Sequence, residues 1–393
     1  MVDANKLKQD RINLVKNTIT KKEKTNQIFH FGNLFSWKIY DAGYKLSEAL
    51  NDYAIMEKVI RHTFENYKID SCYETGWRNP IQVTESLGND EYVINDVANS
   101  INIHDQCFME AEDYPALIAD PKKFLWQTFL PRKYKALKKD TNSPDFRNFL
   151  GKYGEFGAFM GRVGEIQNEF GIPDFTDPAA AIDYSGNGYE ILFCFLRGIK
   201  GLAYDIRRDP EKVLAAMDAI DQTFAIPKLE RAKAQQPKGT NPNFCVDTNP
   251  VMLGHIILSP KQFEKFYWPH LKRVIELTET QDKLAFVFAE GASDRFYDFF
   301  QEFPKDRFVL LAEMNDIFEM RKRLPNVTMM GGMTTDLLGK GTAQECVDYT
   351  KHLIDTLGPD GFIFSENKMI SFPYDCTHEN LKAVSDFVSS YRF

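Results

Sequence analysis

The sequence predicts an α/β fold, namely a single (β/α)8 TIM barrel in which parallel strands alternate with helices. Three observations predict it. Short, nearly continuous apolar runs are typical of strands buried on both faces, as in a parallel sheet covered by helices. Between them lie stretches with apolar residues at every third or fourth position, which is typical of amphipathic helices. This alternation repeats along the whole chain, which favours a closed barrel over an open sheet.

Eight segments are the predicted strands, in chain order 26–35, 68–74, 155–164, 243–249, 284–290, 307–313, 326–333 and 361–366. The connections 75–154 and 165–242 are much longer than the others, and we expect them to form extra helices over the barrel mouth. Residues 1–25 are predicted to be an N-terminal helical extension. No Gly/Ser linker or change of composition marks a boundary, so residues 1–393 are interpreted as one domain.

Two later connections show helical signals in detail. The stretches 259–279 ("SPKQFEKFYWPHLKRVIELTE") and 342–357 ("TAQECVDYTKHLIDTL") carry apolar residues at helical spacing. Thr342, with Glu345 three residues later, forms the Ser/Thr-x-x-Glu capping box that begins many helices. The sequence therefore predicts helices in the places that a barrel requires.

The composition excludes several classes of protein. Of 393 residues, 43% are hydrophobic and 26% charged, which is an ordinary globular balance. The net charge of −8 gives no broad positive potential, so nucleic acid is not an expected partner. No apolar run approaches the roughly 20 residues of a spanning helix, and the polar amino terminus lacks a secretory core. The six cysteines form no C-x-x-C pair, which is typical of reduced thiols. We expect a cytoplasmic protein with no membrane contact.

Three predicted strands end on a glutamate: Glu290, Glu313 and Glu366. Active sites of such barrels form at the carboxyl ends of the strands, so we expect these carboxylates around one rim. Carboxylates without an equal number of bases favour a bound cation or a raised pKa. The three glutamates are therefore the predicted catalytic residues. The alternative is a carboxylate that caps the next helix or pairs with a cation such as Arg295.

Four segments resemble the uroporphyrinogen decarboxylase superfamily: "FLRGIKGLAYDIRRDPEKVLAAMDAI" (195–220), "SPKQFEKFYWPHLKRVIE" (259–276), "AEGASDRF" (289–296) and the long stretch 329–384 that begins "MMGGMTTDLLGKGT". They occur in the same order as in that superfamily. The resemblance implies an eight-stranded barrel of the uroporphyrinogen decarboxylase type. It also implies one of two activities: decarboxylation of uroporphyrinogen without a cofactor, or zinc-dependent methyl transfer to or from a corrinoid protein.

Departures from the superfamily patterns favour the second activity. The decarboxylase uses an arginine-bearing first strand-to-helix loop to bind a substrate rich in carboxylates, but no arginine occurs here between Arg11 and Arg61. Thiol-specific methyltransferases have a His-x-Cys on the fifth strand and a Cys on the eighth. This chain has Phe288 and Glu290 at the first place and "SENK" (365–368) at the second. The resemblance therefore points to the O-demethylase methyltransferase I type, with carboxylate in place of thiolate ligation.

The resemblance makes Glu290 the first predicted zinc ligand. His255, Cys245 and Asp247 lie near the end of the predicted fourth strand and complete the candidate ligand set, because zinc accepts imidazole, thiolate and carboxylate. For His255 the alternative is a structural histidine, and for Cys245 a small buried apolar residue.

Phe31, Trp37, Tyr73 and Asn367 are the predicted substrate-binding residues. The aromatic residues near the first two strand ends would supply flat walls for an aromatic ring, and core packing is the alternative.

The expected function is methyl transfer from a methoxylated substrate, an aryl methyl ether, to the cobalt of a corrinoid protein, with zinc as Lewis acid on the ether oxygen. Cobalamin is expected on the partner, since the chain has no D-x-H-x-x-G segment, and the connections 75–154 and 165–242 are the expected docking surface. The alternatives are a uroporphyrinogen decarboxylase-type lyase and a non-catalytic ligand-binding barrel. The oligomeric state stays open, with a homodimer as one alternative.

Overall fold

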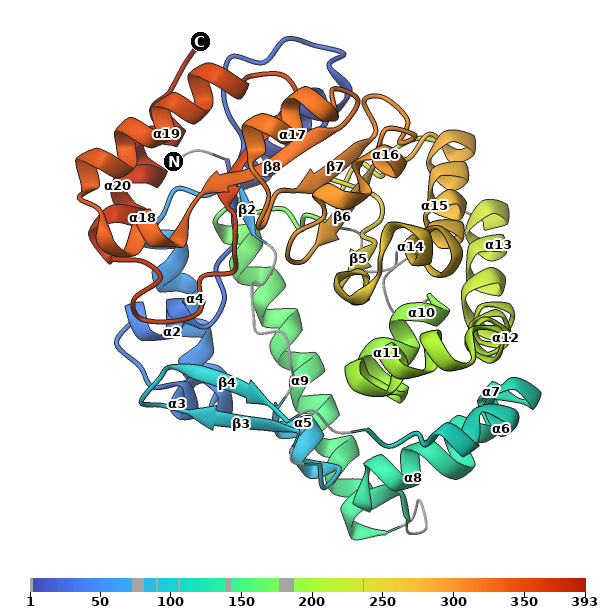
Figure 1. Cartoon of the computed structure of the whole chain (residues 1–393). Coiled ribbons are helices and arrows are strands. Elements are labelled where there is room, and N and C mark those ends of the chain that lie inside the picture. The colour runs from blue at the N-terminus through green and yellow to red at the C-terminus, as the bar shows by residue number, and fades with distance from the viewer. Residues whose placement is uncertain are drawn as a thin grey trace.

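The computed structural model describes residues 3–72, 81–89, 91–104, 107–138, 143–176, 187–235 and 237–393 (Figure 1). Its centre is a curled sheet of seven parallel strands in the order β2-β1-β9-β8-β7-β6-β5. The strands are β1 (His30–Gly32), β2 (Ser71–Cys72), β5 (Val251–Met252), β6 (Ala285–Ala289), β7 (Phe308–Leu311), β8 (Thr328–Met333) and β9 (Phe362–Glu366). The predicted α/β class with a parallel sheet is confirmed.

The segment 173–176 lies in the gap between β2 and β5. The Val246 N–H donates to the Phe175 carbonyl oxygen at 2.8 Å, and Thr176 forms an isolated parallel bridge with Val246. On the other side, Ser71 Oγ donates to the Pro173 carbonyl oxygen at 2.8 Å. Within the described residues this segment is not an eighth strand, so the structure supports a seven-stranded half-barrel rather than the full closed barrel that the sequence predicts.

The predicted strand at 155–164 is wrong, because these residues lie inside the long helix α9 (Pro144–Glu169). Ser143 caps the helix by accepting a hydrogen bond from the Phe146 N–H, and Pro144 occupies its first turn, where the missing N–H costs nothing. Phe159 and Val163 are buried one helical turn apart against α4 and α5. Burial of this face stabilises a helix, although the mixture of glycine and aromatic residues resembles that of a strand.

The other predicted strands agree with β1, β2, β6, β7, β8 and β9, but the one at 243–249 is displaced. Strand β5 begins only at Val251, and Val246 and Thr248 form isolated bridges. The capping box at Thr342 and Glu345 is present at the start of α19, as predicted. The predicted helix 259–279 is divided into two, with Tyr267 between them and a proline in the first turn of the second.

Helices cover the outer face of the sheet (Figure 1). In the carboxyl-terminal half these are α14 (Pro260–Phe266), α15 (Trp268–Gln281), α16 (Tyr297–Phe300), α17 (Ile317–Arg323), α18 (Thr335–Lys340), α19 (Ala343–Leu357) and α20 (His378–Ser390). The preceding helices are α1 (Ala4–Thr20), α2 (Trp37–Asp41), α3 (Leu46–Asn51), α4 (Tyr53–Asn66), α5 (Ile81–Ser86), α6 (Tyr114–Ala119), α7 (Pro121–Phe124), α8 (Leu130–Lys133), α9, α10 (Gly188–Ile191), α11 (Gly198–Arg208), α12 (Pro210–Ile220) and α13 (Ile226–Gln235). An antiparallel hairpin that the sequence analysis missed joins β3 (Tyr92–Asn95) to β4 (Ser100–Ile103).

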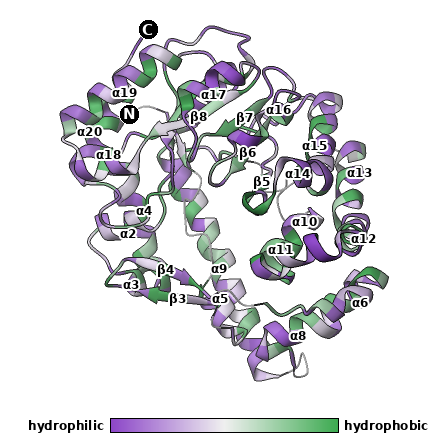
Figure 2. Cartoon of the chain, in the orientation of Figure 1, coloured by the Kyte–Doolittle hydropathy of each residue, from purple (hydrophilic) through white to green (hydrophobic). Residues whose placement is uncertain are grey.

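Figure 2 shows hydrophilic and hydrophobic residues alternating along the helices around the sheet, as amphipathic packing requires. Among the described residues, none of the helices combines the length and the apolar character needed to cross a bilayer.

Aromatic side chains fill the interior of the curled sheet. The Phe31 ring contacts Phe175 edge-on with centroids 4.6 Å apart, and Phe175 in turn meets Phe286 at 5.3 Å. Helix α1 closes the base of this cluster with Ile12, Val15 and Ile19. Its place at the amino ends of the strands is fixed by the Gly361 N–H, which donates to the Thr18 carbonyl oxygen at 3.0 Å just before β9. The interior is therefore a packed core, and the active site of such a fold is expected at the opposite, carboxyl end of the strands.

Five glycines lie on one face of α9. A Cβ added at any of them would meet no atom within 4 Å outside the helix backbone. Because Phe159, Val163 and Ile166 are buried on the opposite face, these glycines point into open space. They are Gly151, Gly154, Gly157, Gly161 and Gly164.

Candidate functional site

Glu290, Glu313 and Glu366 all stand at carboxyl ends of strands, as their place in the sequence predicts. Glu290 directly follows β6, Glu313 lies two residues beyond β7, and Glu366 is the last residue of β9. Their surroundings differ: Glu290 is exposed, Glu313 is half-buried and Glu366 is fully buried.

Glu313 is held against the loop that follows β6. One of its carboxylate oxygens accepts a short hydrogen bond from the Gly291 N–H. Gly291 has a φ of +77°, in the left-handed region that glycine adopts without strain. Two residues later in each loop, Asn315 Oδ1 accepts from the Ser293 N–H at 3.0 Å and Asn315 Nδ2 donates to Ser293 Oγ at 3.0 Å. These bonds fix Glu313 beside Glu290.

The surroundings of Glu313 favour its protonated form. Burial is the largest cause and raises the pKa of this carboxyl, and the negative charge of Glu290 raises it further. The Gly291 N–H and the ammonium group of Lys368 act in the opposite direction but do not cancel the effect. A half-buried carboxyl that keeps its proton above its ordinary range is a candidate general acid.

Glu366 is engaged by strand β1 on both carboxylate oxygens. Oε1 lies 3.2 Å from His30 Nε2, and Oε2 accepts from the Asn33 N–H at 2.7 Å. His30 is itself buried, with its ring edge-on to Phe364 at 5.0 Å between centroids. This carboxylate therefore joins β9 to β1, and it has little freedom to act on a ligand.

His255 lies in the single turn Gly254–Ile257 that follows β5. It is fully buried, and among the described residues neither ring nitrogen makes a hydrogen bond of good geometry. Burial and the nearby Arg295 charge lower the pKa of His255 to about 3, so the imidazole is neutral. Arg295, the expected alternative partner of Glu290, instead donates to the carbonyl oxygens of His255, Ile256, Leu258 and Ala292. It thereby ties the loop after β5 to the loop after β6.

The buried carboxyl of Glu190, which the sequence analysis missed, accepts hydrogen bonds from the backbone at the start of this turn. Glu190 Oε1 accepts from the Leu253 N–H at 2.9 Å, the Gly254 N–H at 3.0 Å and the Tyr267 hydroxyl at 2.8 Å. Burial raises the pKa of Glu190 to about 7, although these hydrogen bonds oppose the shift. Its signal in the sequence was weak, because a single glutamate before the apolar run "ILFCFL" resembles the start of an ordinary helix.

Cys245 and Asp247 lie at the other end of the strands. Asp247 accepts from the Leu284 N–H at 2.8 Å, immediately before β6 begins, and from the Asn241 N–H at 2.7 Å. Cys245 is fully buried in the interior cluster, and burial raises the pKa of its thiol. The structure therefore does not bring these two residues together with Glu290. The displaced start of β5 is the physical reason.

Zinc usually requires three or four converging protein ligands. Within the described residues, only Asp41, His62 and His378 bring three such side chains to within 4.8 Å of one another, and none of them belongs to the expected set. The residues at the mouth thus offer the carboxylates of Glu290 and Glu313 without a third converging ligand, and they do not fit a complete zinc site.

The predicted substrate-binding residues have different surroundings. Phe31 is buried in the interior, and Trp37 is buried with its Nε1 donating to the Cys376 carbonyl oxygen at 2.9 Å. Neither presents an open wall. Tyr73 lies outside the described residues. The Asn367 N–H pairs with the Met333 carbonyl oxygen at 2.8 Å, and its buried side-chain Oδ1 has no hydrogen-bond partner within the part of the chain that the structure describes.

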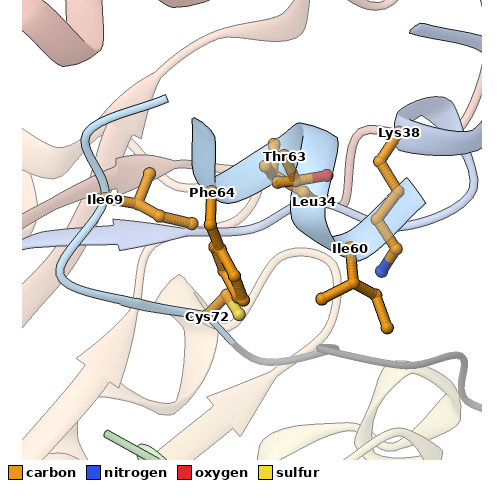
Figure 3. Close-up of a pocket in the computed structure, with 7 residues that line it drawn as sticks. All are labelled: Leu34, Lys38, Ile60, Thr63, Phe64, Ile69 and Cys72. Carbon is orange, nitrogen blue, oxygen red and sulfur yellow. The ribbon is translucent and has the colours of Figure 1, made fainter. Parts of the chain in front are cut away.

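Exposed apolar side chains follow three of the strands at the mouth. Ile256 comes after β5, Met314 after β7 and Tyr374 after β9. A cavity beside β1 and β2 is not an alternative substrate site, because its volume of about 10 Å³ holds no more than one water molecule (Figure 3).

Comparisons with known proteins agree with this architecture. The family model described as "Uroporphyrinogen decarboxylase (URO-D)" matches residues 192–391. Among solved structures, a methyltransferase from Methanosarcina mazei has a TM-score of 0.58 and 11% sequence identity, covering 98% of this chain and 98% of that chain. No curated protein matches the sequence. The structural likeness extends the fold over the whole chain, and the family match covers half of it. The chain belongs to the uroporphyrinogen decarboxylase (URO-D) family.

Proposed function

We propose that the protein transfers a methyl group from a methoxylated substrate, an aromatic methyl ether, to the cobalt of a corrinoid carried by a partner protein. The observation that carries the proposal is Glu313, a half-buried carboxyl with a raised pKa beside Glu290 at the carboxyl ends of β6 and β7. The family and the fold shared with a methyltransferase support the reaction class.

Glu313 acts as the general acid. When the methyl carbon passes to its acceptor, the C–O bond breaks and its electron pair stays on oxygen. A phenolate is a poor leaving group in a site partly removed from water, and the Glu313 proton neutralises it as the bond breaks. Such a positioned acid contributes roughly 10²- to 10⁴-fold to the rate. The exposed Glu290 then relays a proton from solvent back to Glu313.

The exposed apolar residues at the mouth contact the aromatic ring of the substrate and the corrinoid ring. Ile256, Met314 and Tyr374 give the aromatic substrate and the flat face of the corrinoid an apolar surface. The unpaired Asn367 Oδ1 accepts a hydrogen bond from a hydroxyl group on the substrate ring.

Zinc as a Lewis acid stays a prediction of the sequence. Because the described residues at the mouth supply no third converging ligand, we derive no step through it. Metal analysis of the purified protein and of Glu290→Ala tests this part: loss of bound zinc from the variant alone would assign the ion to the mouth.

Docking of the corrinoid partner is proposed at the long connections. Arg207 and Arg208 end α11 within the second of them, and Arg208 Nη1 donates to the Tyr204 hydroxyl at 2.6 Å. Charge reversal by Arg207→Glu should slow methyl transfer with a corrinoid protein more than with free cobalamin, because surface charges act mainly on association. Equal slowing with both acceptors would remove this surface from the proposal.

The test of the function is methyl transfer measured by the visible spectrum of the cobalt, with a panel of methoxybenzenes and a reduced corrinoid protein. The wild type should react, Glu313→Gln should be strongly impaired, and Glu279→Gln, an exposed glutamate in α15, should behave as wild type. The absence of transfer from every methoxybenzene would refute the proposal.

Uroporphyrinogen serves as the contrasting substrate, because the family name favours a decarboxylase. The segment between Arg11 and Arg61 contains no arginine to neutralise its carboxylates, so we expect no product. Formation of coproporphyrinogen would instead assign a lyase activity to this chain.

A further inference from the structure

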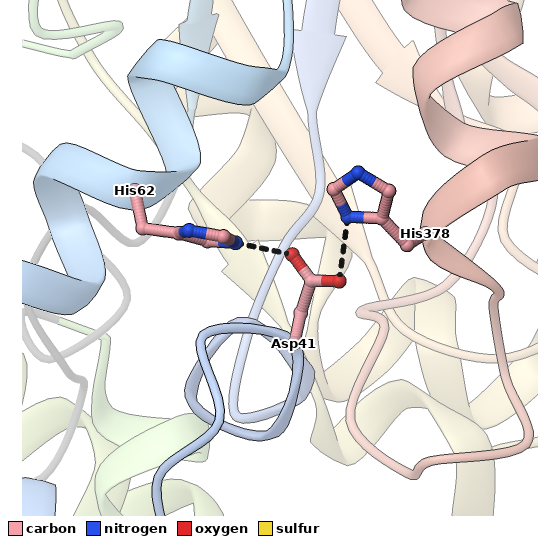
Figure 4. Close-up of side chains that lie close together, drawn as sticks. All are labelled: Asp41, His62 and His378. Carbon is pink, nitrogen blue, oxygen red and sulfur yellow. Dashed lines mark hydrogen bonds and ion pairs between the residues drawn. The ribbon is translucent and has the colours of Figure 1, made fainter.

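A cluster of ligand-type side chains lies away from the mouth, where α2, α4 and α20 meet (Figure 4). Asp41 ends α2, His62 lies near the end of α4, and His378 is the first residue of α20. Figure 4 shows both imidazoles pointing toward the Asp41 carboxylate. His62 Nε2 is 3.0 Å from Asp41 Oδ2, and His378 Nδ1 is 3.0 Å from Asp41 Oδ1.

We infer that Asp41, His62 and His378 form a binding site for a divalent transition-metal ion, with zinc as the ion whose ligand preference they match. Two imidazoles and a carboxylate are donors that zinc accepts in both structural and catalytic sites. One donor atom from each residue lies within 4.8 Å of the other two. Ligands about 2.0–2.1 Å from a tetrahedral zinc stand roughly 3.3 Å apart, so the observed 3.0 Å contacts need to open only slightly.

The carboxylate is oriented by a neighbour that does not itself have to bind the ion. The buried Tyr67 hydroxyl donates to Asp41 Oδ2 at 2.6 Å, and it lies 2.8 Å from His378 Nδ1. Carboxylates that ligate metals are typically held by such outer hydrogen bonds.

His62 has an outer partner as well. The Asn66 side-chain amide lies 3.2 Å from His62 Nδ1, and its nitrogen donates to the His62 carbonyl oxygen at 2.8 Å. Metal binding through Nε2 requires the proton on Nδ1, which needs an acceptor. Because Asn66 Nδ2 donates to the His62 carbonyl oxygen, a half-turn of the amide would set its oxygen against that carbonyl, so we expect the Asn66 side chain to move away and leave the Nδ1 proton to solvent on binding.

The site is open on one side. The side chain of Asp41 is 5% exposed, that of His62 31% and that of His378 46%. The exposed side provides an access route for the ion and space for a water molecule as the fourth ligand. Because the three ligands come from the first and last parts of the chain, a bound ion would join α20 to α2 and α4.

The experiment uses the full-length protein freed of metal by chelation and then titrated with zinc alone. Wild type should bind one zinc per chain at this site by calorimetry, and its unfolding temperature should rise on binding. His62→Ala and His378→Ala should lose both effects, while His352→Ala, which removes an exposed histidine from α19, should keep them. Cobalt(II) in place of zinc should give the visible absorption of a four-coordinate ion in the wild type and in His352→Ala, but not in His62→Ala or His378→Ala.

Controls separate this site from the mouth. Circular dichroism of the metal-free variants tests their folding, and His378→Gln provides a less disruptive substitution. If the wild type binds no zinc, or if both histidine variants bind it as the wild type does, the inference is wrong and the three residues form a hydrogen-bond network only. Loss of the zinc from Glu290→Ala, with retention in His378→Ala, would likewise overturn it and place the ion at the mouth.

Discussion

Glu313 and Glu366 follow the same sequence pattern, a short apolar strand that ends near a glutamate, but their chemistry differs. Glu366 is fully buried and is bonded on both oxygens, by His30 of β1 and by the N–H of Asn33, which directly follows β1. Glu313 is half-buried, accepts a hydrogen bond from the Gly291 N–H and faces the charge of Glu290. The pattern therefore places a carboxylate at the end of a strand, whereas the neighbouring strand or loop decides whether the carboxylate is fully buried and bonded or half-buried with a raised pKa.

The largest effect is expected from a substitution of Glu313, the proposed general acid. Glu313→Gln keeps an oxygen that can accept from the Gly291 N–H but removes the transferable proton. The rate of methyl transfer should fall by roughly 10²- to 10⁴-fold, while the free energy of unfolding should change by less than about 1 kcal/mol. Single-turnover kinetics and urea unfolding measure the two quantities. A variant as fast as the wild type would show that Glu313 is not the acid.

Glu366→Ala should act on stability instead. It leaves the Asn33 N–H buried without its acceptor and opens a cavity between β1 and β9, which together should cost about 3–4 kcal/mol. Urea unfolding measures the loss, and Glu366→Gln, which retains an acceptor oxygen, should lose less. An unchanged midpoint for Glu366→Ala would mean that the carboxylate is not the link between the two strands.

Glu190 extends the comparison to a carboxyl that is buried away from the mouth. Burial raises its pKa from 4.5 to about 7. A raised pKa contributes stability that is present below the unfolded-state value and is lost as the pH rises through about 7. The free energy of unfolding of the wild type should therefore decline by on the order of 2–3 kcal/mol as the pH rises from 4.5 to about 7, because of this group. Glu190→Gln should flatten the decline in urea unfolding measured from pH 5 to 8, and an equally steep decline in the variant would assign it to other groups.

The smallest effect is expected from Glu290→Gln. Removing this charge lowers the pKa of Glu313, because the Glu290 carboxylate is one of the causes that raise it. The general acid then loses its proton at a lower pH, so the alkaline fall of the pH–rate profile should move to lower pH. The displacement should shrink in high salt, since Glu290 is exposed. A profile that does not move would mean that the two carboxyls titrate independently.

The periodic pattern predicted the strands of the carboxyl-terminal half because each is a buried apolar run with a clear end. The pattern failed at 155–164, where the mixture of glycines and aromatic residues resembles a strand. These residues form a helix because Ser143 caps its start and because buried side chains one helical turn apart pack on the same face. The pattern also displaced β5, because Val246 and Thr248 are buried like strand residues but only form isolated bridges. Whether a buried apolar segment forms a strand depends on the strand that it pairs with, and that partner lies elsewhere in the sequence.

Within the candidate site, the sequence predicted where the three glutamates stand and could not predict what surrounds them. The partner of Glu366 lies more than 300 residues away at His30, and His378 of the proposed metal site is equally far from Asp41 in the chain. His62 and His378 each look like ordinary helical residues in the sequence. Only the fold brings them to the same carboxylate.

The glycine face of α9 has a consequence for engineering. Each helical glycine costs about 1 kcal/mol relative to alanine, and at five positions an added methyl group would meet nothing. The helix thus holds stability that substitution can recover, for instance by Gly154→Ala and Gly161→Ala together. If the stabilised variant also transferred methyl groups more slowly to a corrinoid protein, the exposed backbone at these glycines of α9 would be a contact surface for that partner.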